Sequence, residues 1–146
     1  MADKIKGQCL CGSVAFEITT SIPMVDACHC KMCQRWSGGP FIAASVSADS
    51  NIAFAYDDTL TWYDSSDWAR RGFCSVCGSS LFYKLNEQPE HWAIAAGCLD
   101  LPDSVQMKQE IFVDEKPGYY AFAGDHPRLT GEETMAAFKA ASAPES

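Results

Sequence analysis

The sequence has no long hydrophobic run and little positive charge. No apolar segment approaches the roughly 18 to 20 residues that a membrane helix needs, and the opening MADKIKGQCL lacks the apolar stretch of a secretory signal. Lys and Arg number 11 against 19 Asp and Glu, for a formal net charge of −8. We therefore expect no membrane partner, no nucleic-acid partner bound through its phosphates, and a cytoplasmic location with reduced thiols.

The chain also lacks an internal repeat or a low-complexity linker, so we expect a single domain over residues 1–130 and a helix or tail over 131–146. Short β-prone segments separated by Gly, Pro, Asp, Asn and Ser predict a mainly β fold. These segments are residues 12–19, 40–48, 59–65, 79–85, 91–97 and 110–115. Residues 30–36 could form one helical turn. Residues 131–142 contain good helix formers after Thr130, a possible cap, although a fraying tail fits equally well.

The chain is rich in cysteine, with eight residues of this type. In a reduced compartment such a density indicates metal binding or catalysis rather than disulfides. Cys9, Cys11, Cys74 and Cys77 occur in CLCG and CSVCG, where a glycine that tolerates positive φ follows the second cysteine. These four thiols are a plausible closed structural zinc site, and a metal there would tie the chain start to its middle.

Three further cysteines, Cys28, Cys30 and Cys33, fall within six positions. Three protein ligands and an open position are how catalytic zinc is held, so this cluster is a candidate second, open zinc site. The alternative is another structural site that is completed by Cys98 or by a histidine.

The remaining candidates have simpler interpretations. We expect Cys98 to be a small buried apolar residue. His29, between two candidate ligands, should point away from the metal toward solvent or a hydrogen-bond partner. His91 and His126 lie in loop-like settings and should be exposed, so we expect no histidine ligand.

A few polar and aromatic residues could also serve a site. Arg71 could pair with a substrate carboxylate, or it could be a surface or strand-edge arginine. Gln34 could orient a ligand or cap the turn after Cys33. The three tryptophans near these motifs could wall a pocket, although core packing is the simpler expectation; they are Trp36, Trp62 and Trp68.

Three blocks of the sequence, GQCLCGSVAFEI, CHCKMCQRWSGGPF and RRGFCSVCGSSLFY, resemble in order and spacing the signature blocks of the glutathione-dependent formaldehyde-activating enzyme family, which includes centromere protein V-like members. The resemblance runs from about Gly7 to about Arg128. It implies a single zinc-binding domain of the Mss4-like type, with several coiled short sheets. It also implies a structural zinc on Cys9, Cys11, Cys74 and Cys77 and a more labile zinc, with partial occupancy, on Cys28, Cys30 and Cys33.

The resemblance further implies an activity: the joining of glutathione and formaldehyde to give S-hydroxymethylglutathione, or the reverse carbon–sulfur lyase reaction. The chain departs from the family after residue 100, where members often have His-Ile-Phe or His-Ile-Trp and this chain has Glu110-Ile111-Phe112. We expect this change from histidine to Glu110 to affect the choice of substrate more than the metal sites.

Three thiolates on Zn²⁺ leave a net charge of −1, which suits a bound nucleophilic thiolate better than polarisation of a carbonyl. We therefore expect a zinc-dependent carbon–sulfur lyase that acts on a glutathione-like thiol and a small aldehyde. The alternative is a non-catalytic, zinc-stabilised β scaffold or binding module. Nucleic-acid binding would need a local basic stripe, for which the chain offers Lys31, Arg35, Arg70 and Arg71.

Overall fold

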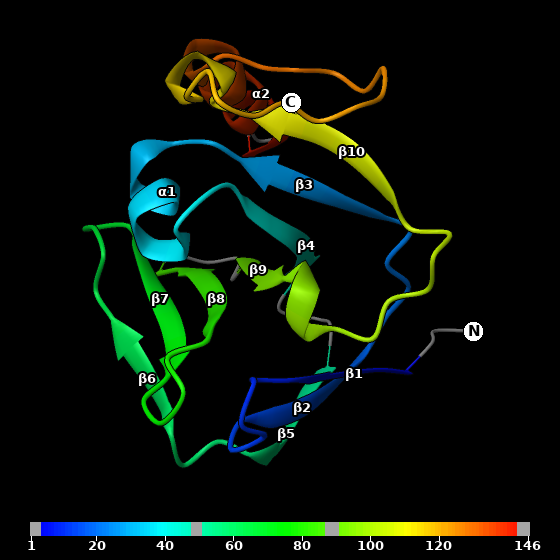
Figure 1. Ribbon diagram of the computed structural model, residues 1–146, viewed down its shortest axis with the longest axis vertical. Coiled ribbons are helices and arrows are strands. Elements are labelled where there is room, and N and C mark those ends of the chain that lie inside the picture. Colours follow the sequence, from blue (N-terminus) through cyan, green and yellow to red (C-terminus); the bar gives the residue numbers. More distant parts are fainter. Residues whose placement is uncertain (1–3, 48–50, 87–90, 143–146) are drawn as a thin grey trace. The chain divides into compact units, whose positions relative to one another are not determined.

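The computed structural model describes residues 4–47, 51–86 and 91–142, in which ten strands, two α-helices and two 3-10 helices are found (Figure 1). The prediction of a mainly β fold with short sheets and a C-terminal helix is confirmed. The chain forms two compact units, Met1–Val25 with Ile42–Gln106 and Asp26–Phe41 with Met107–Ser146. The single domain over residues 1–130 stays a prediction. No helix among the described residues has the length and apolar character needed to cross a bilayer.

The first unit contains two groups of antiparallel strands, in the orders β1-β2-β5 and β4-β9-β8-β7-β6. Their bounds are β1 (Lys4–Gln8), β2 (Ala15–Thr19), β4 (Phe41–Ser47), β5 (Asn51–Tyr56), β6 (Leu60–Tyr63), β7 (Ala69–Cys74), β8 (Ser80–Leu85) and β9 (His91–Ala95), followed by the 3-10 helix η1 (Ala96–Cys98). Strands occur in the predicted segments 12–19, 40–48, 59–65, 79–85 and 91–97. Ala48 and the turn expected at Gln88-Pro89 lie outside the described residues.

An aromatic cluster forms the core of the first unit. Phe16 is buried on β2, where buried and less buried residues alternate as the sequence predicts. Its ring lies 5.1 Å from that of Phe82, which is fully buried on β8. Trp62 stacks on Phe82 at 5.9 Å and meets Trp92 edge-on at 5.4 Å. This cluster joins the two groups of strands, because Phe16 comes from one group and the other three rings from the second.

The predictions for the three tryptophans and for Arg71 have different outcomes. Core packing holds for Trp62, and Trp36 is half-buried against Phe41 at 5.4 Å. It is wrong for Trp68, which is 56% exposed. Arg71 is neither on the surface nor at a strand edge: it is buried on β7, between β6 and β8, with its guanidinium 4.9 Å from the centre of the Tyr83 ring.

The second unit contains most of β3 (Met24–Cys28) and β10 (Gln106–Ile111), which are neighbours in a sheet, together with α1 (Lys31–Ser37), the 3-10 helix η2 (Val113–Glu115) and α2 (Gly131–Ser142) (Figure 1). The predicted turn over 30–36 is confirmed as α1. Gly38, with φ of 79°, ends this helix by donating its N–H to the Gln34 carbonyl.

The predicted strand over 110–115 is only partly right. Strand β10 ends at Ile111 because Phe112 adopts a left-handed conformation with φ of 56°, after which residues 113–115 turn into η2. A phenylalanine in this region of φ gives no signal in sequence, since strand propensity favours the extended form.

Helix α2 begins at a reciprocal cap that settles the open choice at 131–142 in favour of a helix. The Thr130 hydroxyl accepts from the Glu133 N–H at 3.2 Å, and the Glu133 carboxylate accepts from the Thr130 N–H at 2.9 Å. Thr134 is buried in the first turn, and its hydroxyl donates to the Thr130 carbonyl at 2.7 Å.

Candidate metal centres and their histidine–glutamate network

The four-cysteine cluster lies in the first unit, where two turns meet. Among the described residues, the sulfur atoms of Cys9, Cys11, Cys74 and Cys77 all lie within 4.8 Å of one another. The Cys9–Cys11 and Cys11–Cys74 sulfur distances are 3.7 and 3.8 Å. A tetrahedral metal with bonds of about 2.3 Å places its sulfurs about 3.8 Å apart. The spacing of this cluster therefore fits a tetrahedral ion.

Local backbone conformation and hydrogen bonds prepare these sulfurs for a cation. Gly12 and Gly78, which follow the two CxC and CxxC turns, have φ of 81° and 77°, as the sequence predicts. The Thr59 hydroxyl, 3.3 Å from the Cys74 sulfur, lowers the pKa of Cys74. The Ser79 hydroxyl and nearby backbone groups lower the pKa of Cys77 to about 5, whereas burial raises the pKa of Cys9. Thiolates, the form that binds metal, are thus favoured at two of the four positions.

The three-cysteine cluster lies in the second unit, at the end of β3 and the start of α1. The sulfurs of Cys28, Cys30 and Cys33 lie within 4.8 Å of one another, and no fourth Cys, His, Asp or Glu of the described residues joins this group. Cys30 caps α1 by accepting the Cys33 N–H at 3.4 Å. Hydrogen bonds from the Cys28 thiol to the Cys30 and Cys33 sulfurs, together with burial, raise the pKa of Cys28. The three groups therefore resist joint ionisation unless a cation offsets their charge.

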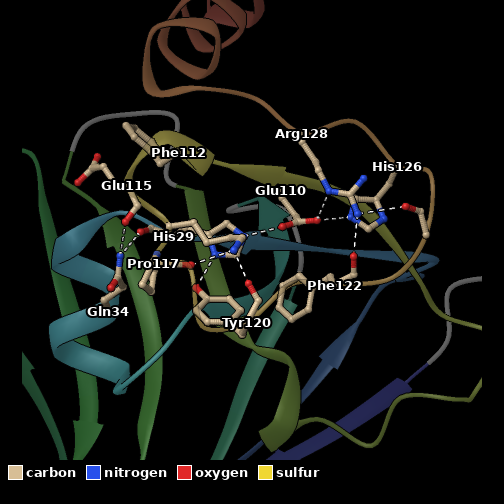
Figure 2. Close-up of polar contacts among 12 residues, drawn as sticks. His29, Gln34, Glu110, Phe112, Glu115, Pro117, Tyr120, Phe122, His126 and Arg128 are labelled. Carbon is tan, nitrogen blue, oxygen red and sulfur yellow. Dashed lines mark hydrogen bonds and ion pairs between the residues drawn. The ribbon is translucent and has the colours of Figure 1, made fainter.

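His29 points away from this cluster, as expected, but toward buried partners rather than solvent. Its side chain is fully buried, with Nε2 2.7 Å from Glu110 Oε1 and Nδ1 2.7 Å from the Tyr120 hydroxyl (Figure 2). An ionised carboxylate only accepts hydrogen bonds, so His29 Nε2 donates to Glu110, and Nδ1 shares a hydrogen bond with the Tyr120 hydroxyl. The ring also lies 5.6 Å from both the Tyr120 and the Phe122 rings.

Glu110 is the centre of the network. Its side chain is 1% exposed, and its second oxygen, Oε2, accepts from His126 Nε2 at 2.5 Å and from Arg128 Nε at 2.9 Å (Figure 2). Burial by itself would raise the pKa of Glu110, but the hydrogen bonds from His126 and His29 and the charge of Arg128 outweigh burial and lower it. Glu110 is therefore a carboxylate with a full set of donors.

The segment after η2 supports Tyr120. The Lys116 ammonium donates to the carbonyls of Pro117, at 2.9 Å, and Tyr120, and it lies 4.8 Å from the Tyr120 ring centre. Burial, followed by negative charge at neighbouring groups, raises the pKa of Tyr120. The hydroxyl therefore keeps its proton at neutral pH and can donate a hydrogen bond to His29.

Gln34 has a role that neither sequence interpretation described. Its side-chain amide donates to the His29 carbonyl at 2.6 Å and to the Glu115 carbonyl at 2.9 Å (Figure 2). Glu115 Oε1 in turn accepts from the Lys31 N–H at 3.1 Å. Gln34 thus ties the cysteine loop to η2. The Gln34–His29 bond also fixes the peptide that joins two of the candidate ligands.

Two expectations for single residues were wrong. His126 is not exposed: its side chain is 8% exposed because it donates to Glu110. His91 is half-buried at the start of β9 rather than in a loop.

Cys98 is half-buried, and its sulfur donates to the Ala95 carbonyl at 3.0 Å. Burial raises the pKa of its thiol to about 12, in keeping with a largely apolar role.

Sequence reasoning missed Tyr120 and Arg128 and saw Glu110 only as a departure from a pattern. One signal in the sequence could have pointed to them. If His29 lies between cysteines but binds no metal, its buried ring needs hydrogen-bond partners elsewhere in the chain. A carboxylate, a second histidine and an arginine within residues 110–128 could have supplied them.

Comparison with known proteins supports one family. The family model described as glutathione-dependent formaldehyde-activating enzyme matches residues 4–115. An uncharacterized lyase of Schizosaccharomyces pombe is 27% identical over 130 residues, covering 89% of this chain and 93% of its own. A Halomonas elongata protein provisionally described as a glutathione-dependent formaldehyde-activating enzyme is 27% identical over 124 residues, covering 79% and 78%.

The fold has a relative among solved structures. The crystal structure of a Rhodobacter sphaeroides protein matches with a TM-score of 0.54 and 21% identity, over 84% of this chain and 98% of the other. At this identity the likeness concerns the fold alone. Because the family model covers most of the sequence, this chain belongs to the glutathione-dependent formaldehyde-activating enzyme family.

Proposed function

We propose that this chain is a carbon–sulfur lyase that joins or separates a glutathione-like thiol and a small aldehyde such as formaldehyde. The two cysteine clusters could each bind a metal ion, and zinc fits both sets of sulfur donors. In this proposal Cys9, Cys11, Cys74 and Cys77 hold a structural zinc. Cys28, Cys30 and Cys33 hold a second zinc beside which the reaction takes place.

One observation carries the enzymatic proposal: the second cluster offers three sulfur ligands and no fourth side chain among the described residues. Cys98 and the histidines were the alternatives for a fourth ligand. The Cys98 sulfur instead bonds the Ala95 carbonyl, and both ring nitrogens of His29 have other partners. A four-coordinate ion held by three residues has room for a substrate, which a closed structural site lacks.

The chemistry follows from the charge of the site. A zinc ion on three thiolates would lower the pKa of an added thiol and hold the resulting thiolate. In the forward direction the thiolate sulfur forms a bond to the aldehyde carbon, the carbonyl π pair moves to oxygen, and this oxygen takes up a proton. The reverse reaction breaks the same carbon–sulfur bond and returns the proton to the thiol.

The residues around the three-cysteine cluster hold its cysteines in position. Gln34 and the backbone bond from the His29 N–H to the Ile111 carbonyl, at 3.1 Å, fix the loop that holds the cysteines. Such a loop presents its sulfurs at set positions, and a preorganised ligand set reduces the entropy lost when a metal or substrate binds.

The test compares Cys30→Ser with Cys98→Ser, a matched control outside both clusters. Metal content per chain should fall from two zinc equivalents to one in Cys30→Ser and stay at two in Cys98→Ser. Nuclear magnetic resonance with ¹³C-formaldehyde and glutathione should show the wild type and the control accelerating S-hydroxymethylglutathione exchange, and Cys30→Ser failing to do so. Equal exchange rates in all three proteins would refute the proposal. Loss of folding in Cys30→Ser alone would instead make the cluster structural, as in the scaffold alternative.

The cellular location, the true thiol and aldehyde, and the identity of the second metal belong to the same proposal. The cytoplasm is proposed because a reducing compartment keeps the eight cysteines as free thiols that can bind metal. Iron is the competing metal for a thiolate site. The measurement of metal content per chain, described above for Cys30→Ser, distinguishes iron from zinc.

A further inference from the structure

Two cationic side chains of the first unit converge on one indole ring. Arg70 on β7 and Lys84 on β8 lie directly opposite each other in the strand register. The Arg70 guanidinium carbon lies 5.6 Å from the centre of the Trp62 ring, and the Lys84 ammonium lies 6.0 Å from the same centre. The strands that carry these residues, β6, β7 and β8, are neighbours in one sheet (Figure 1). Like charges at opposed positions repel each other, so this arrangement favours a nearby negative charge.

The tryptophan rings offset only part of this repulsion. The Lys84 ammonium also lies 4.8 Å from the centre of the Trp92 ring, and Trp92 is its direct partner on β9. The face of an indole attracts a cation, but more weakly than an anion that also accepts hydrogen bonds from it. The rings therefore position the two cations and leave their charge largely in place.

Arg70 also has an unsatisfied donor. Its Nε is buried without a hydrogen-bond partner, and in the part of the chain that the structure describes only one other buried side-chain nitrogen or oxygen, Ser66 Oγ, shares this state. Both residues belong to one turn, in which the Ser66 N–H donates to the Ala69 carbonyl at 3.3 Å. A buried donor without an acceptor is costly, and two such groups at one turn indicate a common acceptor from outside the chain.

Carboxylates of the same loop do not supply this acceptor. Asp64 and Asp67 lie between β6 and β7, yet both are exposed and, within the described ranges, neither forms an ion pair with Arg70. The formal net charge of the chain is −8, so the overall field of the protein does not attract anions. Binding of an anion here would depend on these local groups.

We propose that Arg70 and Ser66, with Lys84 beside them, form a binding site for a small oxyanion, namely a phosphate or carboxylate group. The Nε–H and a terminal N–H of a guanidinium match two oxygens of either group, and a serine hydroxyl can donate to the same group. Lys84 adds a second positive charge. The site lies within the first unit and is independent of the reaction proposed at the three-cysteine cluster.

The test titrates the full chain with inorganic phosphate and, separately, with succinate, at an ionic strength held constant with chloride. Calorimetry measures the affinity, and a ¹H–¹⁵N spectrum follows the Arg70 Nε–H resonance. Arg70→Gln removes the guanidinium. Arg35→Gln is the matched control, because Arg35 is an exposed arginine on α1. The two probes distinguish a phosphate ligand from a carboxylate ligand.

At least one probe should bind the wild type and Arg35→Gln equally and Arg70→Gln about tenfold or more weakly, because a charge-assisted hydrogen bond is lost. Ser66→Ala should weaken binding by a smaller factor. The Arg70 Nε–H resonance should shift as that probe is added. The same probe should raise the melting temperature of the wild type more than that of Arg70→Gln, because a ligand of the folded state stabilises it.

A purely structural role for Arg70 gives a different result. Arg70→Gln would then lower the melting temperature equally with and without the probes, and neither probe would move the Arg70 Nε–H resonance. Either observation overturns the inference. If Arg70→Gln does not fold, Arg70→Lys decides, because it keeps a cation against Trp62 and lacks the Nε–H: weaker binding supports the site, and unchanged binding overturns it.

Discussion

Replacement of Glu110 should expose how much the buried network contributes to stability. In Glu110→Ala the donors at His29 and His126 lose their acceptor at side-chain exposures of 0% and 8%. Each stranded buried donor costs about 1 to 3 kcal/mol. Arg128 contributes less, because its side chain is 40% exposed and water can replace the carboxylate. The summed cost of the two stranded donors agrees with the roughly 3 to 5 kcal/mol by which removal of one partner of a buried ion pair typically destabilises a protein.

Glu110→Gln should cost much less, about 1 to 2 kcal/mol, because the amide can satisfy both sides. Its carbonyl can accept from His126 and Arg128, and its NH₂ can donate to His29 if the imidazole moves its proton to Nδ1 and donates to the Tyr120 oxygen. What is lost is the negative charge beside Arg128.

The same pair of variants should differ in pH dependence. The pKa of Glu110 is lowered in the folded protein, so its contribution is complete above the unfolded value of about 4.3 and is lost as pH falls through the folded value. The stability difference between wild type and Glu110→Gln should therefore be largest at neutral pH and shrink in acid. Protonation of the candidate ligand cysteines affects both proteins equally and cancels in the difference.

Urea unfolding followed by tryptophan fluorescence, at neutral pH and at successive pH values below the unfolded pKa of about 4.3, measures these differences. Glu17→Gln is the matched control, because Glu17 forms a 3.8 Å ion pair with Lys4 at the surface, where such pairs contribute little. A Glu110→Ala protein within about 1 kcal/mol of the wild type would refute the reasoning about stranded buried donors. So would a constant difference between wild type and Glu110→Gln across the acid range.

Three further changes test other parts of the structure. Gly7→Ala should destabilise the first unit by about 1 to 3 kcal/mol in urea unfolding, because its Cβ would lie 2.5 Å from Phe16 Cζ, whereas Gly97→Ala meets no atom within 4 Å and should be close to neutral. Thr130→Ala removes the cap of α2 and should lower the helical circular-dichroism signal and cost about 1 kcal/mol; an unchanged melting curve would contradict the capping role. Cys77→Ser should abolish metal binding at the four-cysteine cluster and unfold the first unit; retention of two zinc equivalents with a native melting temperature would contradict that assignment.

The sequence alone determined the local features. Alternation in Phe16 and its neighbours predicted a strand, and the glycines after Cys11 and Cys77 predicted left-handed turns. Thr130 with its following acids indicated a capped helix as one of two alternatives. Cysteine spacing separated four thiols from three. Each of these depends on residues close together in the chain, where propensity and spacing carry the information.

Only the tertiary structure decided which distant groups meet. Arg71 proved to be buried and Trp68 exposed, although they lie only three residues apart in the sequence. Strand β10 ended early at Phe112 because of a backbone conformation that no propensity predicts.

The same holds for the environment of the second cluster. Glu110 lies 81 residues from His29 in sequence, yet its carboxylate and the imidazole are 2.7 Å apart. A buried carboxylate is stable only where several donors converge on it. The convergence of residues from β10, from the loop after β3 and from the segment after η2 is a property of the folded chain. The cysteine pattern therefore predicted where a metal could bind, and the fold decided why histidine does not join it.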